Sequence, residues 1–162
     1  MIENVLRGYA SASAEWIARS EAISCDQLYA HVADLFPVSP SRVLDIGAGA
    51  GRDAAWLASS GHDVTAVEPV AEFRHAGMQL HATSNITWLD DRLPDLRLLP
   101  DSAFDCVLLG AVWQHLDDEQ RAAAMHRLAE LTGSGGVVIM SLRHGPGTPN
   151  RPVYQVKPRG HY

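Results

Sequence analysis

Three glycines and one acid have the residue types and the spacing of a nucleoside-binding unit. Gly47, Gly49 and Gly51 alternate with two alanines in the sequence GAGAG, which follows the apolar run VLDI. Because glycine has no Cβ atom, such a turn can bend sharply and pass close to a ligand. Glu68 ends the next β-branched run, and a carboxylate there can accept hydrogen bonds from both hydroxyls of a ribose. These four residues predict a nucleoside site.

The elements around these residues must bring the turn and the acid together. VLDI has the composition of a buried strand, residues 52–60 form an alanine-rich helical stretch, and DVTAVE has the composition of a second strand. Open α/β sheets bind ligands at the carboxyl ends of their strands, where both the turn and Glu68 would lie. Asp45 lies inside the first strand and needs donors when buried. The amides of the glycine turn can provide them.

The spacing of the glycines separates two classes of nucleoside. A dinucleotide site has the pattern G-x-G-x-x-G, whereas this turn has G-x-G-x-G and Arg52 holds the position of the last glycine. A phosphate-binding loop is excluded because no G-K-[ST] follows. The segment resembles motif I of the class I S-adenosylmethionine-dependent methyltransferases, whose pattern is close to [VL]-L-D-[IL]-G-x-G-x-G. It is similar in particular to the type 11/12-like methyltransferase domains.

The resemblance continues along the chain and implies further contacts to S-adenosylmethionine. In these enzymes the acid after the third strand contacts the adenine amino group. Asp91 corresponds to that acid in this sequence, with Asp90 as the alternative. The backbone of Arg92 would lie beside the adenine ring. The run FDCVLLGAVWQHL resembles the segment whose backbone flanks the methionine part of the cofactor. The cofactor-binding residues implied in this way are Tyr9, Asp45, Gly47, Gly49, Gly51, Glu68, Asp90, Asp91, Arg92, Gly110 and Ala111, with core packing as the alternative role for Tyr9.

The catalytic candidates are two histidines. Methyl transfer from a sulfonium needs alignment and exclusion of water, and an oxygen or nitrogen nucleophile can also need a general base. His115 and His144 follow the fourth and fifth strands, on the side that would face the ligand. Trp113 and Arg143 are further candidates for the pocket lining. Four other histidines are expected on the surface, and none has the spacing of a helical metal site, so no metal is expected: His62, His75, His81 and His126.

The order of apolar runs predicts an α/β fold. Five apolar strands alternate with helices, which indicates a parallel sheet with helices on both faces, and the resemblance implies the Rossmann-like order 3-2-1-4-5. A turn at Gly133–Gly136 is expected to precede the fifth strand, Val137–Leu142. Asp117 has the type and spacing of a helix cap with Gln120. Leu28, Val32 and Leu35 are expected on the buried face of an N-terminal helix.

The C-terminus departs from the family pattern. Residues 1–142 are expected to form the cofactor-binding domain with its N-terminal helices, and residues 143–162 an irregular Gly/Pro-rich tail. The family's sheet ends in an antiparallel hairpin of a sixth and a seventh strand, for which the tail is too short. The chain is therefore expected to be truncated, to be a natural short form, or to be completed by a partner. The fifth strand would then be an open edge, which favours a homodimer or poor solubility.

Composition limits the remaining function classes. The formal net charge of −6 argues against broad nucleic-acid or anionic-membrane binding. The apolar runs are strand-sized, no signal peptide is visible, and the two cysteines are isolated, so a cytoplasmic enzyme is expected. The leading hypothesis is methyl transfer to a small molecule. The alternatives are a truncated, non-catalytic domain that binds cofactor or a partner, and an NAD(P)-dependent oxidoreductase.

Overall fold

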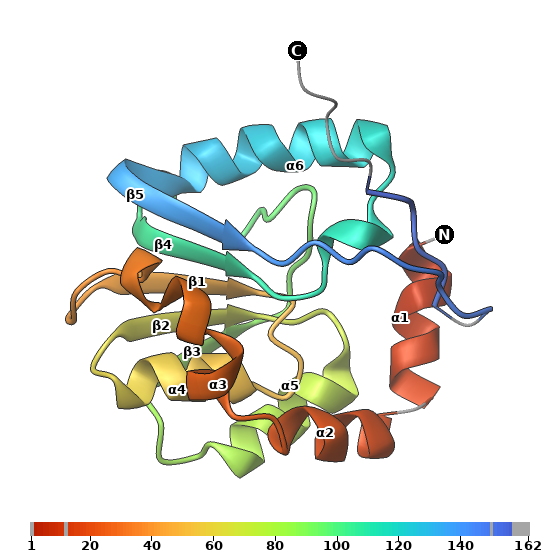
Figure 1. Ribbon diagram of the computed structural model, residues 1–162, viewed down its shortest axis with the longest axis horizontal. Helices are drawn as coiled ribbons and strands as arrows, with labels where there is room; N and C mark the ends of the chain where they lie inside the picture. Colours follow the sequence, from red (N-terminus) through yellow and green to blue (C-terminus); the bar gives the residue numbers. More distant parts are fainter. Residues whose placement is uncertain (1, 12, 150, 157–162) are drawn as a thin grey trace.

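The sheet has the predicted order. The computed structural model describes residues 2–11, 13–149 and 151–156, and its five strands are all parallel in the order β3-β2-β1-β4-β5 (Figure 1). The sequence prediction of a Rossmann-like sheet is therefore confirmed. The strands are β1 (Arg42–Ile46), β2 (Asp63–Val67), β3 (Ile86–Leu89), β4 (Phe104–Leu109) and β5 (Thr132–Met140).

Two apolar clusters cover the two faces of the sheet. Leu44 and Ile46 of β1 pack with residues of α6, whereas Val43 packs on the opposite face with residues of α3 and α4. This alternation follows from the period of two in a strand. The helical segments are α1 (Ile2–Ser11), α2 (Ser13–Glu21), α3 (Cys25–Leu28), η1 (Ala30–Leu35), α4 (Arg52–Ser59), α5 (Ala71–Leu80), η2 (Trp113–His115) and α6 (Asp118–Leu131).

The cap of α6 is confirmed. Of the buried face predicted for Leu28, Val32 and Leu35, only Val32 packs against the core. Asp117 and Gln120 form a capping box with their side chains and backbone amides. Leu28 and Leu35, expected inside, are 47% and 50% exposed. The reason is that α3 has only four residues and continues as the 3₁₀ helix η1, so the spacing of the inward side chains differs from 3.6. Tyr29 faces the core instead.

The glycine-rich stretch before the fifth strand belongs to the strand. β5 begins at Thr132 and ends at Met140, so the separate turn and the strand end at Leu142 were both predicted wrongly. The register passes from Phe104↔Thr132 to Cys106↔Val137, which leaves three extra residues on the β5 side. Gly135 has a φ of +76° in this irregularity. Glycine adopts this conformation more easily than other residues, so the extra residues are tolerated here.

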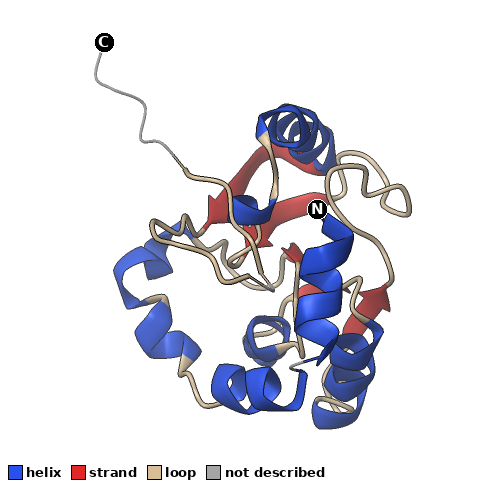
Figure 2. Cartoon of the chain, turned by 90° about the vertical axis from the view of Figure 1, so that its right-hand side faces the viewer, coloured by secondary structure: helices blue, strands red, loops and turns tan. Residues whose placement is uncertain are grey.

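The segment after β5 crosses the carboxyl ends of the strands and reaches α1 (Figures 1 and 2). Its described part holds one isolated antiparallel bridge, between Thr148 and Arg151. Tyr154 donates its backbone N–H to the carbonyl of Gln114 at 2.7 Å. Among the described residues, no helix has the length and apolar character needed to cross a membrane.

Candidate functional site

The glycine turn after β1 is bonded to the end of β2. The amides of Gly47 and Ala48 both donate to the carbonyl of Val67, at 2.8 and 3.0 Å. Gly49 has a φ of +58°, and a Cβ atom built on it would meet nothing within 4 Å. A side chain at Gly49 would therefore point into open space, which is the property expected of a turn that lies against a ligand.

Glu68 is a buried acid that also holds this turn. Its Oε2 accepts from the amide of Gly49 and its Oε1 from the amide of Val70, each at 2.8 Å. Only 5% of the residue is exposed. Burial raises the pKa of Glu68 to about 6, and the two amide hydrogen bonds oppose that rise. Each carboxylate oxygen has a second lone pair, so Glu68 can still accept from a ligand.

The sequence predicted that Asp45 would accept hydrogen bonds from the amides of the glycine turn, but in the structure Asp45 does not receive these amides. Those of Gly47, Ala48 and Gly49 already donate to Val67 and Glu68. Asp45 is 2% exposed, and its Oδ2 has no hydrogen-bond partner in the described part of the chain. Burial raises its pKa well above the usual range, and the nearby acids Asp53 and Glu68 raise it further, while the backbone of Ala54 opposes this.

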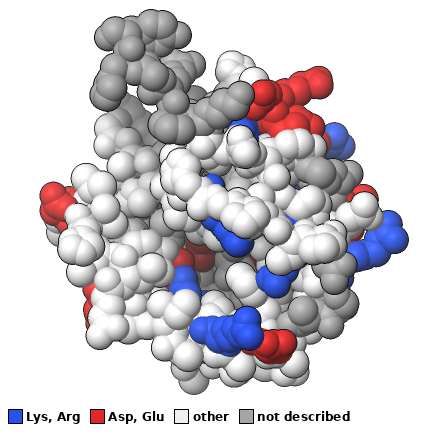
Figure 3. Space-filling view, turned by 45° about the vertical axis from the view of Figure 1, so that its right-hand side comes forward, with Lys and Arg blue, Asp and Glu red and all other residues white. Residues whose placement is uncertain are grey.

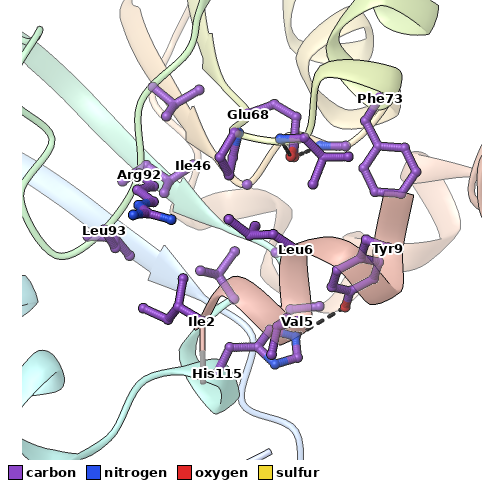
Figure 4. Close-up of a pocket in the computed structure, with 18 of the residues that line it drawn as sticks. Ile2, Val5, Leu6, Tyr9, Ile46, Glu68, Phe73, Arg92, Leu93 and His115 are labelled. Atoms are coloured by element: carbon purple, nitrogen blue, oxygen red, sulfur yellow. Dashed lines mark hydrogen bonds between the residues drawn. The ribbon is translucent and has the colours of Figure 1, made fainter. Parts of the chain in front are cut away.

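A first cavity of about 130 Å³ lies between α1 and the ends of β1, β2 and β4 (Figure 4). Leu6 and Val5 extend from α1 toward the strands and occupy much of the space between Glu68 and His115. The volume lies below the roughly 300–1,000 Å³ of most small-molecule sites. The predicted site residues that line this cavity are Tyr9, Gly47, Gly49, Glu68, Asp91, Arg92, Gly110, Ala111 and His115.

A second cavity of about 540 Å³ lies on the other side of the glycine turn. It shares Gly47, Gly49, Gly110, Ala111 and Trp16 with the first cavity, so the two spaces meet at the ends of β1 and β4. Apolar side chains of α2, α3, η1 and β5 form much of its wall. The polar or charged residues that line it include Arg19, Asp45, Arg52, Asp53 and Ser141.

His115 is held between two partners at the edge of the first cavity. Its Nε2 lies 3.1 Å from the Tyr9 hydroxyl, and its Nδ1 lies 3.1 Å from the carbonyl of Pro152. The ring is 9% exposed. Burial lowers the pKa of His115; the hydrogen bond to the carbonyl of Pro152 opposes this, and the positive charges of Arg143 and Arg151 lower the pKa further. His115 is therefore a neutral, buried histidine at neutral pH.

Other predicted residues lie away from the two cavities. Asp90 forms an ion pair with Arg74 at 3.2 Å and is exposed, and His144 lies on an exposed loop. Gly51 packs under the ring of Trp88. Trp113 belongs to the core and Arg143 is exposed, so neither lines a cavity. Of the four histidines expected on the surface, His62 is buried, which contradicts that prediction.

Asp53 was missed by sequence reasoning. It is 7% exposed and accepts hydrogen bonds from the Tyr29 hydroxyl at 2.5 Å, from Arg52 at 2.8 Å and from the thiol of Cys25 at 3.4 Å. The sequence did contain one signal for Asp53, because it is an acid in the first turn of a helix that follows a glycine turn. Figure 3 shows acidic atoms inside a hollow of the surface, with basic side chains at its border.

Comparisons with known proteins point to one family. A model described as a methyltransferase domain matches residues 43–136, more than half of the chain. An uncharacterised methyltransferase of Mycobacterium tuberculosis is 32% identical over 117 residues, or 68% of this chain and 58% of the relative. The ubiquinone biosynthesis O-methyltransferase of Rhodopseudomonas palustris is 29% identical over 119 residues, or 73% of this chain and 46% of that protein. The chain spans about half the length of the curated relatives it matches.

A solved structure supports the same fold. The 1,6-didemethyltoxoflavin N1-methyltransferase of Burkholderia thailandensis, with 1,6-didemethyltoxoflavin and S-adenosylhomocysteine bound, superposes with a TM-score of 0.71. The two chains are 24% identical, and the match covers 94% of this chain and 70% of the other. At 24% identity, this match shows that the two chains share a fold.

Proposed function

Because the chain belongs to the methyltransferase-domain family, we propose that it transfers a methyl group from S-adenosylmethionine to a small-molecule acceptor. The observation that carries the proposal is the bond from Gly49 to Glu68 at the junction of the two cavities. It joins a buried acid to a turn that is open toward a ligand, and we assign the ribose hydroxyls to this acid. Two names among the similar proteins are consistent with a small-molecule acceptor: a ubiquinone biosynthesis O-methyltransferase and a 1,6-didemethyltoxoflavin N1-methyltransferase.

The first cavity suits the adenosine part of S-adenosylmethionine. Glu68 would accept hydrogen bonds from the ribose hydroxyls through its remaining lone pairs. Asp91 lines the cavity and already accepts from the amides of Arg92 and Leu98, each at 2.8 Å. These bonds fix the carboxylate at the position where the resemblance implies an adenine contact. Since Leu6 and Val5 occupy part of the space, these two side chains would turn aside when the cofactor binds, while α1 stays over the cavity.

The second cavity suits the methionine part of the cofactor and the acceptor. Asp45 lines this space, and its buried Oδ2 has no hydrogen-bond partner among the described residues. A buried carboxyl oxygen without a partner is costly, so a donor group from a ligand would stabilise it. The apolar wall of α3, η1 and β5 suits an acceptor with an apolar or aromatic body.

The chain's own residues supply alignment, exclusion of water and a base. When bound, S-adenosylmethionine supplies a methyl group on a sulfonium, and transfer breaks the carbon–sulfur bond and forms a bond to the acceptor. Residues of α1 and of the glycine turn would orient the reacting groups and exclude water. His115 is the histidine that lines the first cavity, and we assign its Nε2 the proton that an oxygen or nitrogen acceptor loses.

A turnover assay tests this function. The purified chain is incubated with S-adenosylmethionine and a library of phenols, amines and nitrogen heterocycles, and the release of S-adenosylhomocysteine is measured. We expect at least one acceptor to give release that depends on both enzyme and acceptor. Cofactor binding without turnover on any class would favour the non-catalytic alternative.

The open edge of the sheet leads to a separate proposal. β5 pairs with β4 on one side, and its residues Val137, Val138, Ile139 and Met140 are half-buried. We propose that two copies of the chain associate along this edge, since an apolar strand edge favours pairing. Sedimentation equilibrium should show a dimer, and a stable monomer at high concentration would contradict it.

A further inference from the structure

The described part of the C-terminal segment lies against η2 and α6. We call residues Arg151–Val156 the C-terminal strap. Tyr154 donates its amide to the carbonyl of Gln114 at 2.7 Å. The guanidinium of Arg121 donates to the carbonyl of Tyr154 at 3.2 Å and to that of Gln155 at 3.1 Å. Three backbone groups of the strap are therefore bonded to Gln114, which directly precedes His115, and to Arg121 in the first turn of α6.

The strap determines which nitrogen of His115 carries hydrogen. A carbonyl oxygen can only accept, so the contact between the carbonyl of Pro152 and Nδ1 requires hydrogen on Nδ1. In a neutral imidazole the other nitrogen, Nε2, then has a free lone pair. The Tyr9 hydroxyl lies 3.1 Å from Nε2 and donates to it. This tautomer is the one that can accept a proton on the cavity side.

The strap also contacts the helices that cover the first cavity. The guanidinium of Arg151 lies over the ring of Tyr9, 5.3 Å from its centroid, and over the ring of Trp16, 5.1 Å from its centroid. Tyr9 belongs to α1 and Trp16 to α2, and their rings pack edge to face. A cation over two aromatic faces is attracted to both, so Arg151 links the strap to both N-terminal helices.

We infer that the C-terminal strap is a positioning element of the active site, which holds His115 in the tautomer whose Nε2 is the acceptor, here of the Tyr9 hydroxyl, and keeps α1 over the cofactor cavity. The inference rests on the proposed role of His115. Pro152 and Arg151 act through His115, Tyr9 and Trp16, and they are positioning residues. The groups bonded to His115 are the Tyr9 hydroxyl from α1 and the carbonyl of Pro152 from the strap. The cations Arg143 and Arg151, from the segment after β5, act on His115 through their charge.

The test is the tautomer of His115 in the full chain, without cofactor or acceptor. Nitrogen NMR of chain labelled in its histidines, with His115→Asn to assign the signal, reports which ring nitrogen carries hydrogen. We expect hydrogen on Nδ1 at neutral pH. Tyr154→Pro removes the amide that anchors the strap and should produce a mixture of tautomers, whereas Tyr154→Ala keeps that amide and should match the wild type.

Two further variants test the inference even if Tyr154→Pro fails to fold. Arg121→Gln removes the bonds to the carbonyls of Tyr154 and Gln155 and should shift the tautomer in the same direction. Arg151→Ala should speed amide exchange in α1 and α2 by roughly 5- to 30-fold, and Arg151→Lys should restore part of the protection.

The outcomes separate this inference from the proposed function. Wild-type His115 with hydrogen on Nε2, or folded Tyr154→Pro and Arg121→Gln variants with an unchanged tautomer, would overturn the inference. Titration with S-adenosylhomocysteine is a separate readout. Failure of the wild type to bind it would overturn the cofactor proposal and leave the tautomer result intact.

Discussion

Oε2 of Glu68 accepts the amide hydrogen of Gly49 at 2.8 Å, and this bond joins the end of β2 to the turn after β1. Oε1 of the same side chain accepts from Val70, at the start of the connection to α5. One buried acid thus fixes the two backbone segments that border the first cavity. The cofactor assignment depends on this arrangement.

Replacement of Glu68 by alanine should weaken binding of S-adenosylhomocysteine. Charge-assisted hydrogen bonds to the ribose contribute about 1.5–3 kcal/mol, which corresponds to roughly 10- to 150-fold in affinity. Isothermal titration calorimetry measures the change. Asp63→Ala is the matched control, because Asp63 is an exposed acid at the start of β2 and lines neither cavity. Unchanged affinity in Glu68→Ala would refute the ribose assignment.

The pKa of Glu68 predicts opposite pH effects on binding and on stability. Ribose hydroxyls need a carboxylate to accept their hydrogens, so affinity for S-adenosylhomocysteine should fall as the pH drops below about 6. Calorimetry across this range should show a weaker dependence in Glu68→Gln. If both proteins had the same pH profile, Glu68 would not be the group that titrates.

Stability without ligand should change in the other direction. The pKa of Glu68 is raised from 4.5 to about 6 by folding. The protonated form is therefore favoured in the folded state, and its contribution is complete below pH 4.5 and lost as the pH rises through 6. A shift of this size corresponds to about 2 kcal/mol. Urea unfolding at both ends of this pH range should show Glu68→Gln gaining stability relative to the wild type as the pH rises.

Alanine variants at two glycines distinguish the effect of backbone strain from the loss of a ligand site. Gly49 and Gly135 have φ values of +58° and +76°, and a Cβ on either would meet nothing within 4 Å. Alanine in the left-handed region costs about 1–2 kcal/mol, so both variants should lose similar stability in thermal unfolding. Only Gly49→Ala should lose binding of S-adenosylhomocysteine. Equal affinities in the two variants would place the cofactor elsewhere.

The capping box of α6 predicts a purely structural effect. Removal of the Asp117 side chain leaves the amide of Gln120 without its acceptor and should cost about 0.5–2 kcal/mol of unfolding free energy. Asp118→Ala removes an exposed acid at the next position and should change stability by less than about 0.5 kcal/mol. Equal losses in urea unfolding would mean that the cap contributes little.

Local patterns predicted the strands and the glycine turn because their signals lie within a few residues. The apolar run of β1, the spacing of the glycines and the cap at Asp117 each need only neighbouring positions. The partners of the acids could not be predicted in this way. The turn amides bond to Val67 and Glu68 and leave Asp45 without them, which depends on how β1 and β2 are placed in register.

Long-range packing explains the other differences from the sequence prediction. Leu28 is exposed because a short α3 and a 3₁₀ segment replace one regular helix. His62 is buried in the connection between α4 and β2. The contact of Pro152 with His115 joins positions 37 residues apart, and no local pattern marks it. The same holds for Leu6 and Val5, whose positions over the sheet depend on how α1 packs.

Titration calorimetry of the wild-type chain tests the central claim most directly. S-Adenosylhomocysteine and NADH are titrated separately into the same protein at neutral pH. The cofactor assignment predicts one S-adenosylhomocysteine bound per chain and no heat of binding from NADH. Binding of NADH with no binding of S-adenosylhomocysteine would contradict it.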